Sequence, residues 1–191
     1  MMSVPGYDPD REYSSTSIEY PVININADVQ SFMNRMTDEQ YTHFNKMGIS
    51  RETLQDMKIG YNGRYLIYPY IEEDGNYYCA RCIHPDRPED NFWFGDEEFA
   101  VDRIMVFNKN DIDRCENGTL IIAESEDNLL TIKQLGLPGI AVTSATNIEK
   151  IDAPSLNWIS TVFLWANHSN ESQRAARSLA TQLGFKARLI R

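Results

Sequence analysis

Two short polar segments in the C-terminal half carry the side chains best suited to chemistry, and each directly follows an apolar run. Glu124 and Asp127 follow TLIIA, and Asn167 and Ser169 follow VFLWA. Carboxylate and neutral oxygens are the ligands that Mg²⁺ prefers, and bound Mg²⁺ assists phosphoryl transfer by stabilising the attacking and leaving oxygens. If the fold brings the two segments together, they form an oxygen-rich site suited to that chemistry.

The C-terminal half alternates strand and helix patterns, which decides where these segments lie. The expected strands are 119–123, 139–143, 160–166 and 185–190, separated by helices over 125–136 and 170–184 and a short helical turn over 147–151. This alternation with short loops implies a parallel sheet with right-handed crossovers. Sites in such sheets lie at the carboxyl ends of the strands, which is where Glu124 and the segment 167–169 are expected.

The segment 28–115 has a different pattern, of short helices followed by strands. Apolar residues recur at helical spacing over 28–36, Thr37 and Gln40 form a capping box, and Ser50 is an N-cap that opens another helix. From residue 64 the period changes to two. The turn EEDGN between two such runs is a strong hairpin signal, so residues 64–107 are expected to form an antiparallel β unit.

Length and composition predict a packed protein in the cytoplasm. The chain has 191 residues with 42% hydrophobic content, enough for one medium domain or two small ones that share a core. It holds no apolar run of membrane-spanning length. Residues 1–27 are polar and acidic without the apolar core of a secretion signal, and we expect a flexible tail there. Three cysteines, an odd number, fit a reducing compartment.

The net charge of −10 is unevenly spread. Residues 119–191 hold six acidic and seven basic side chains, so this part carries +1 and residues 1–118 carry −11. Such an acidic chain is a poor general nucleic-acid binder, because phosphate contacts depend on Lys and Arg. Nucleic-acid binding would therefore need a local basic surface, and the last 18 residues offer five bases and no acid. The alternative is that the charge serves ordinary solubility.

The segment TLIIAESEDNLLTIKQLGLPGIAVTSATN resembles the start of a TOPRIM domain, the catalytic fold of bacterial-type DNA primases, topoisomerases and some nucleases. Glu124 falls on the family's invariant Glu, and Asp127 on the Asp that begins its first helix. The segment FLWANHSNESQRAARSLATQLGF is similar to the family's third strand, Asp-x-Asp motif and long helix. The resemblance covers residues 45–191, since the part before residue 116 looks like the N-terminal region of a primase core.

The resemblance implies an α/β fold. A TOPRIM-like parallel sheet of about four strands, flanked by helices, is expected over 116–191, preceded by a small α+β subdomain of the primase-core type over 28–115. It also implies catalytic roles for Glu124 and Asp127 and a metal site at Glu124, Asn167 and Ser169. At that site the chain departs from the family, because Asn167-His168-Ser169 replaces Asp-x-Asp and Ser172 replaces a glycine.

Losing two carboxylates removes most of the attraction for a divalent cation. We therefore expect Mg²⁺ or Mn²⁺ to bind weakly if at all, with Glu126 joining Glu124 and Asp127 as the remaining acidic ligands. Glu124 and Asp127 have an alternative, purely structural interpretation, because carboxylates stabilise the start of any helix. His168 is expected to be a solvent-facing loop residue.

Five basic residues are candidate nucleic-acid contacts. Arg81 follows the predicted hairpin, where primase-like cores present an arginine to nucleic acid, and Arg64 and Lys109 are expected to join it. Arg174 and Arg177 lie on the predicted helix that follows residues 167–169, the turn between strand and helix that we call the elbow. Nearby aromatic residues suit base stacking, namely Tyr77, Tyr78, Phe92, Trp93 and Phe94. The alternative interpretation is a packed β unit with surface arginines.

The two cysteines of the segment CARC have the spacing of zinc ligands, but their position in a strand argues against that role. Cys79 and Cys82 lie three apart in a predicted strand and so face opposite sides of the sheet. No second such pair follows, and His84 and Cys115 are the only further candidates nearby. We expect no zinc.

Three functions remain open from the sequence. The first is a primase-like TOPRIM protein of a phage or mobile element, with a degenerate metal site and a binding or accessory role in DNA replication. Its partners would be single-stranded DNA or RNA template and a replication helicase or other replication protein, with no membrane partner. The second is an active metal-dependent primase or TOPRIM nuclease that uses Glu124. The third is a protein-interaction module whose acidic half contacts a basic partner.

Overall fold

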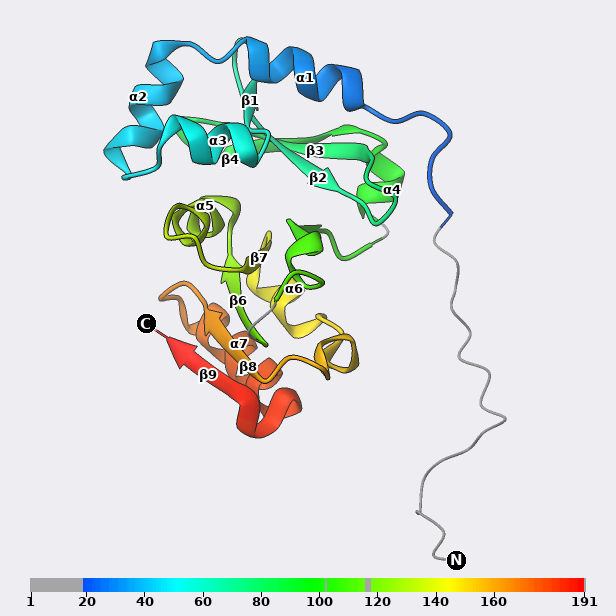
Figure 1. Ribbon diagram of the computed structural model, residues 1–191, viewed down its shortest axis with the longest axis vertical. Helices are drawn as coiled ribbons and strands as arrows, with labels where there is room; N and C mark the ends of the chain where they lie inside the picture. Colours follow the sequence, from blue (N-terminus) through cyan, green and yellow to red (C-terminus); the bar gives the residue numbers. More distant parts are fainter. Residues whose placement is uncertain (1–18, 102, 116–117, 191) are drawn as a thin grey trace, which may run out of the picture.

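The computed structural model describes residues 19–101, 103–115 and 118–190, which form two β-sheets with helices around them (Figure 1). The predicted tail over 1–27 lies largely outside the described residues. Ile25, however, is buried, and its backbone N–H donates to the carbonyl oxygen of Tyr77 at 2.7 Å. Packing against the small sheet therefore begins ahead of the first helix.

Three helices precede the small sheet, and they start where capping chemistry predicts. They are α1 (Asn26–Asn34), α2 (Asp38–Lys46) and α3 (Arg51–Asp56). The backbone N–H of Thr37 donates to Gln40 Oε1 at 3.1 Å, which completes the predicted capping box of α2. The hydroxyl of Ser50 accepts from the backbone N–H of Thr53 at the start of α3. These bonds satisfy N–H groups that the first turn of a helix leaves unpaired.

The small sheet is antiparallel, as the hairpin signal predicts. Its strands follow one another in the order β1 (Gly60–Tyr61), β2 (Leu66–Ile71), β3 (Tyr77–His84) and β4 (Arg87–Gly95). Helix α1 packs across its outer face, where Phe32 and Ile67 share a hydrophobic cluster with Cys82. Cys79 faces the opposite side and packs with Tyr68, so the two cysteines point to opposite faces as predicted.

The large sheet has five strands in the order β5-β7-β6-β8-β9. Four are mutually parallel: β6 (Thr119–Glu124), β7 (Gly139–Val142), β8 (Thr161–Trp165) and β9 (Ala187–Ile190). The remaining elements are α4 (Glu97–Val101), α5 (Glu126–Gln134), α6 (Ala145–Glu149) and α7 (Asn170–Leu183), with short 3-10 turns η1 (Lys109–Asp111), η2 (Ala153–Leu156) and η3 (Gly184–Lys186). The predicted α/β architecture is confirmed.

The fifth strand, β5 (Val106–Phe107), differs from the sequence interpretation. Both residues fall within the range 64–107 that the sequence predicts as an antiparallel β unit, whereas β5 pairs antiparallel with β7 in the large sheet. Periodicity cannot assign a two-residue strand to one of two sheets, because the choice depends on tertiary pairing. Phe107 nevertheless packs against Tyr68 and Tyr70 of β2. The segment thus touches both sheets.

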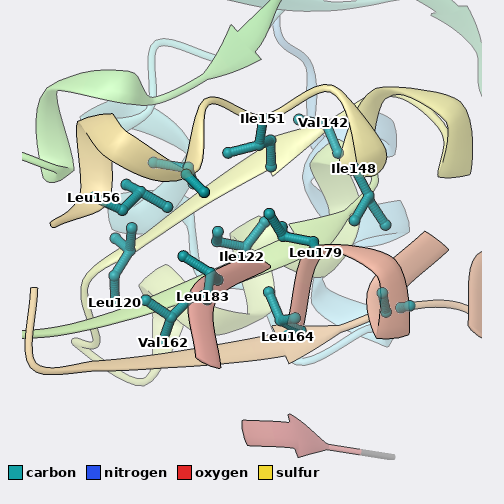
Figure 2. Close-up of a cluster of buried hydrophobic side chains, with 14 of the residues drawn as sticks. Leu120, Ile122, Val142, Ile148, Ile151, Leu156, Val162, Leu164, Leu179 and Leu183 are labelled. Atoms are coloured by element: carbon teal, nitrogen blue, oxygen red, sulfur yellow. The ribbon is translucent and has the colours of Figure 1, made fainter. Parts of the chain in front are cut away.

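Alternate residues of β6 supply two separate clusters of buried side chains. Leu120 and Ile122 pack with Leu179 of α7 on one face, as Figure 2 shows. Ile121 and Ala123 face the other way and pack with α5 and the small sheet. Because strand side chains alternate between faces, a continuous apolar run in β6 is what a sheet covered on both sides requires.

The second of these clusters joins the two sheets into one core. It combines Tyr68 and Tyr70 from β2 with Leu129 from α5 and Ile121 from β6. The position of α5, and hence of the acidic residues at its start, therefore depends on burial between the sheets. Within the described residues, no helix is both long and apolar enough to cross a membrane.

Replacing Leu129 by alanine tests this dependence. Leu129 is fully buried, and deletion of a buried leucine side chain lowers the free energy of unfolding by about 2–5 kcal/mol. Leu135, the residue that caps the C-terminus of the same helix, is 69% exposed, so Leu135→Ala is the matched control and is expected to change stability by less than about 0.5 kcal/mol. Urea denaturation measures both, and equal effects would contradict the assignment of the core.

Candidate functional site

Glu124 is the last residue of β6, and its carboxylate is buried rather than open to solvent. Oε2 accepts from the backbone N–H of Asn167 at 2.9 Å, and Oε1 accepts from the hydroxyl of Ser172 at 2.9 Å. The side chain thus connects the end of β6 to the loop after β8 and to the first turn of α7. The strand ends meet at one edge, as the parallel topology predicts.

Ser169 is exposed and caps α7. Its Oγ accepts from the backbone N–H of Ser172 at 3.0 Å, and the hydroxyls of the two serines lie 2.7 Å apart. Ser172 is 2% exposed and bridges Ser169 to Glu124. A chain of hydrogen bonds therefore runs from Ser169 through Ser172 and Glu124 to the backbone of Asn167.

Asn167 contributes its backbone to Glu124 and its side chain to a neighbouring asparagine. Asn128 Nδ2 lies 3.3 Å from Asn167 Oδ1 and donates to the carbonyl oxygen of Glu124 at 2.7 Å. The amide of Asn128 thus links the first turn of α5 to the elbow. Asn167 and His168 are exposed, which is the position predicted for His168.

The backbone turns sharply between Glu124 and Glu126. Ser125 has φ of +97°, a region that side chains other than glycine rarely occupy, and its hydroxyl caps α5 by accepting from the backbone N–H of Asn128. Such a conformation costs on the order of 1–3 kcal/mol and persists where surrounding contacts fix it. The turn sends two neighbouring carboxylates to different environments.

Glu126 is buried against the small sheet. Tyr70 donates its hydroxyl to Glu126 Oε1 at 2.8 Å, and the guanidinium of Arg81 lies 3.7 Å from the same oxygen. Removal from water raises the pKa of Glu126, although Arg81 and the Tyr70 hydrogen bond oppose that effect. Asp127 is more exposed and accepts from the hydroxyl of Tyr68 at 2.7 Å. Two tyrosines on one face of β2 therefore hold the first turn of α5.

This arrangement corrects the expectation that Glu124, Glu126 and Asp127 together hold a cation. Each carboxylate has different partners, and within the described part of the chain no three His, Cys, Asp or Glu side chains gather closely enough to hold a metal ion. Both oxygens of Glu124 already accept hydrogen bonds, and Ser169 serves as a helix cap. Glu124 is the one carboxylate at the elbow, beside the neutral oxygens of Asn167 and Ser169, and this is a poor donor set for a divalent metal.

The basic residues expected to act together contact different acids. Arg81 lies beside Glu126, with a side chain that is 18% exposed. Arg64 lies 3.8 Å from Asp90, and Lys109 pairs with the buried carboxylate of Glu72. Arg81 is thus the one of the three that contacts the first turn of α5. Arg174 and Arg177 are exposed on α7, which begins at the elbow.

Several residues of the site escaped sequence reasoning. Tyr68 and Tyr70 read as ordinary strand residues, although their spacing of two was the signal that both face the same side. Nothing in the sequence indicated that Asn128 contacts the elbow, because it reads only as a residue near the start of a helix. Ser172 was noticed as a substitution for glycine, but its bond to Glu124 depends on the approach of α7 to β6, which local sequence does not encode.

The amino-acid sequence matches no family model and no curated protein. Solved primase structures do match its fold. The primase fragment of the bacteriophage T7 primase-helicase protein has a TM-score of 0.62 at 20% identity over 79% of this chain and 64% of that one. The Aquifex aeolicus primase, comprising zinc-binding and RNA polymerase domains, has a TM-score of 0.65 at 11% identity, over 83% of this chain and 50% of that one. A DnaG primase catalytic domain bound to ssDNA has a TM-score of 0.63 at 9% identity, over 86% of this chain and 68% of that one.

At these identities the likeness establishes the fold, which is that of phage and bacterial primase domains. The chain spans 64% of the length of the T7 fragment and half of the Aquifex protein.

The bond between Ser172 and Glu124 can be tested by its contribution to stability. Ser172→Ala removes a hydrogen bond to a buried carboxylate and is expected to lower the free energy of unfolding by about 1.5–3 kcal/mol. Ser178→Ala is the matched control, since Ser178 is exposed on the same helix and its loss is expected to cost less than about 0.5 kcal/mol. Chemical denaturation compares the two, and an unchanged stability in Ser172→Ala would show that the bond contributes nothing.

Proposed function

We propose that this chain is a primase-like protein of a phage or mobile-element replication system that binds single-stranded nucleic acid and no longer depends on a metal pair at the elbow. The observation that carries the proposal is the hydrogen-bond arrangement around Glu124 on a primase-type fold. In this arrangement Glu124 joins the end of β6 to the start of α7, and the neutral Asn167 and Ser169 place no second carboxylate beside it. The role that fits is accessory: binding a template strand or a replication protein without independent primer synthesis.

Support for nucleic-acid binding comes from the charge around the elbow. Arg174 and Arg177 are exposed one turn apart on α7, which begins at the elbow, and Arg81 of the small sheet lies beside Glu126 at the start of α5. Arginines three or four apart on a helix lie on one side of it and suit successive phosphates. One similar structure is a primase catalytic domain bound to ssDNA, and another is a fragment of a primase-helicase protein. A replication helicase is therefore the protein partner that we propose.

Charge reversal on α7 tests the nucleic-acid contact. Arg174→Glu with Arg177→Glu is expected to weaken binding of a single-stranded oligonucleotide at least about tenfold. Loss of two phosphate contacts is also expected to reduce the slope of log affinity against log salt by about 1.4. Fluorescence anisotropy across salt concentrations measures both quantities.

The matched control is Arg35→Glu with Lys46→Glu, which makes the same charge change at exposed positions in and beside α1 and α2. Similar losses in both double variants would mean that general charge repulsion, rather than a contact on α7, accounts for the effect.

Calorimetry with Mg²⁺ and Mn²⁺ tests the state of the elbow. The wild type is expected to show no binding tighter than millimolar. The triple variant Asn167→Asp, Ser169→Asp and Ser172→Gly frees Oε1 of Glu124 and adds two carboxylates, so it is expected to gain binding. Ser155→Asp with Asn157→Asp adds the same charge at exposed positions and is expected to bind no metal.

Clear metal binding by the wild type would instead favour the active enzyme. In that case, primer synthesis or nuclease activity abolished by Glu124→Gln would establish the alternative function. If the protein binds neither nucleic acid nor metal, the protein-interaction module is the function that remains.

A further inference from the structure

Strand β9 lies at one edge of the large sheet, and among the described residues β8 is its one strand neighbour (Figure 1). In an edge strand, the N–H and C=O groups of alternate residues point away from the sheet and have no strand partner. At the start of β9, the guanidinium of Arg188 donates to the carbonyl oxygens of Phe185 and Ala187. A side chain of the protein thus takes the place that backbone N–H groups of another strand could take.

The two faces of this edge differ in chemistry. Leu189 is 44% exposed and pairs with Leu164 of β8, which belongs to the cluster that α7 covers. Arg188 pairs with Phe163 and therefore points to the opposite face, where it is exposed. Phe185, two residues before the strand, is 91% exposed. The edge therefore presents an apolar side chain on one face and a cation on the other, next to a further exposed ring.

The charge at this edge is positive. Arg188 donates to backbone carbonyls and Lys186 donates to the carbonyl oxygen of Leu156, and within the described residues neither forms a salt bridge. The last 18 residues of the chain hold five bases and no acid. Arg188 is therefore a cation that a carboxylate of a partner can neutralise, and Lys186 adds positive charge beside it.

A polypeptide suits this edge better than a nucleic acid does. The edge holds carbonyl oxygens as well as N–H groups, and a second polypeptide backbone supplies both the donors and the acceptors that these groups need. Phosphates accept hydrogen bonds but donate none to the carbonyl oxygens. The exposed Leu189 and Phe185 also suit apolar side chains rather than phosphates. Charge and backbone pairing together therefore favour an extended acidic segment of a protein.

We propose that the outer edge of β9 binds an extended segment of another protein in which acidic and apolar residues alternate. The segment adds a strand to the large sheet. Its acidic side chains lie on the Arg188 face and its apolar side chains lie beside Leu189, because side chains alternate along a strand and directly opposite residues interact. Backbone hydrogen bonds supply the affinity, and the alternate side chains supply the specificity. The site requires neither a metal at the elbow nor the nucleic-acid contact on α7.

A fluorescently labelled peptide of about six residues that alternates aspartate and valine is the probe. It is expected to bind the chain with a Kd of about 100 µM or tighter, measured by fluorescence anisotropy. Arg188→Glu replaces attraction by repulsion and is expected to weaken binding at least about tenfold. Arg35→Glu makes the same charge change at the exposed C-cap of α1 and should bind the peptide like the wild type. Circular dichroism and thermal melting establish that both variants are folded.

Methylation of alternate backbone nitrogens in the peptide separates strand pairing from charge attraction. Each of the two methylated peptides keeps every side chain but loses the N–H donors of one of its edges. Methylation of the edge that faces β9 is expected to abolish binding, and methylation of the other edge is expected to leave it unchanged. Equal binding of the two methylated peptides would show that charge alone attracts the peptide, and the proposal would then be wrong.

Three other results would also overturn the proposal. The first is that the wild type does not bind the alternating peptide. The second is a dimer in light scattering that Leu189→Asp dissociates, which would make a second copy of the chain the occupant. The third is that Arg188→Glu weakens binding of a single-stranded oligonucleotide but not of the peptide, which would make the edge a nucleic-acid contact. Because the peptide test uses no nucleic acid and the α7 test uses no peptide, either proposal can fail alone.

Discussion

The buried carboxylate of Glu124 is the contact on which the C-terminal half depends. A charged group in a protein interior is tolerated when hydrogen bonds replace water, and here the backbone N–H of Asn167 and the hydroxyl of Ser172 do so. These two bonds fix the end of β6 against the start of α7. No second carboxylate stands beside Glu124 at the elbow, because Asn167 and Ser169 are neutral, so the elbow has one anionic group and that group already serves the fold.

A second constraint is that the two sheets share one core. Tyr68 and Tyr70 pack between them, and their hydroxyls end at Asp127 and Glu126. Burial raises the pKa of both tyrosines well above its usual value, so the phenols remain protonated donors, and neither is suited to act as a nucleophile. The acids at the start of α5 therefore join the sheets, and the catalytic role that the family resemblance implies for Asp127 stays a prediction.

Much of this structure could be predicted from local patterns. The strand and helix order of the C-terminal half, the capping box at Thr37 and the opposite faces of Cys79 and Cys82 all follow from periodicity and capping rules. The position of Glu124 at the end of a strand could also be predicted, because it directly follows an apolar run. The partners of each carboxylate could not be predicted, because they depend on how separate elements approach. Ser172 reaches Glu124 across 48 positions of sequence, and Tyr70 reaches Glu126 across 56.

The antiparallel strand β5 has a consequence for how the chain can be divided. Residues 106 and 107 precede the first parallel strand in sequence, yet their hydrogen-bond partners are Val142 and Ala141 in β7. A cut near residue 115, between the α+β part and the α/β part, separates these partners. It leaves Phe107 without part of its packing and exposes the edge of β7 to pairing with other chains. The first half thus contributes a strand to the sheet of the second half, in addition to the shared interior. Recombination or truncation at that point would produce two pieces with a tendency to aggregate.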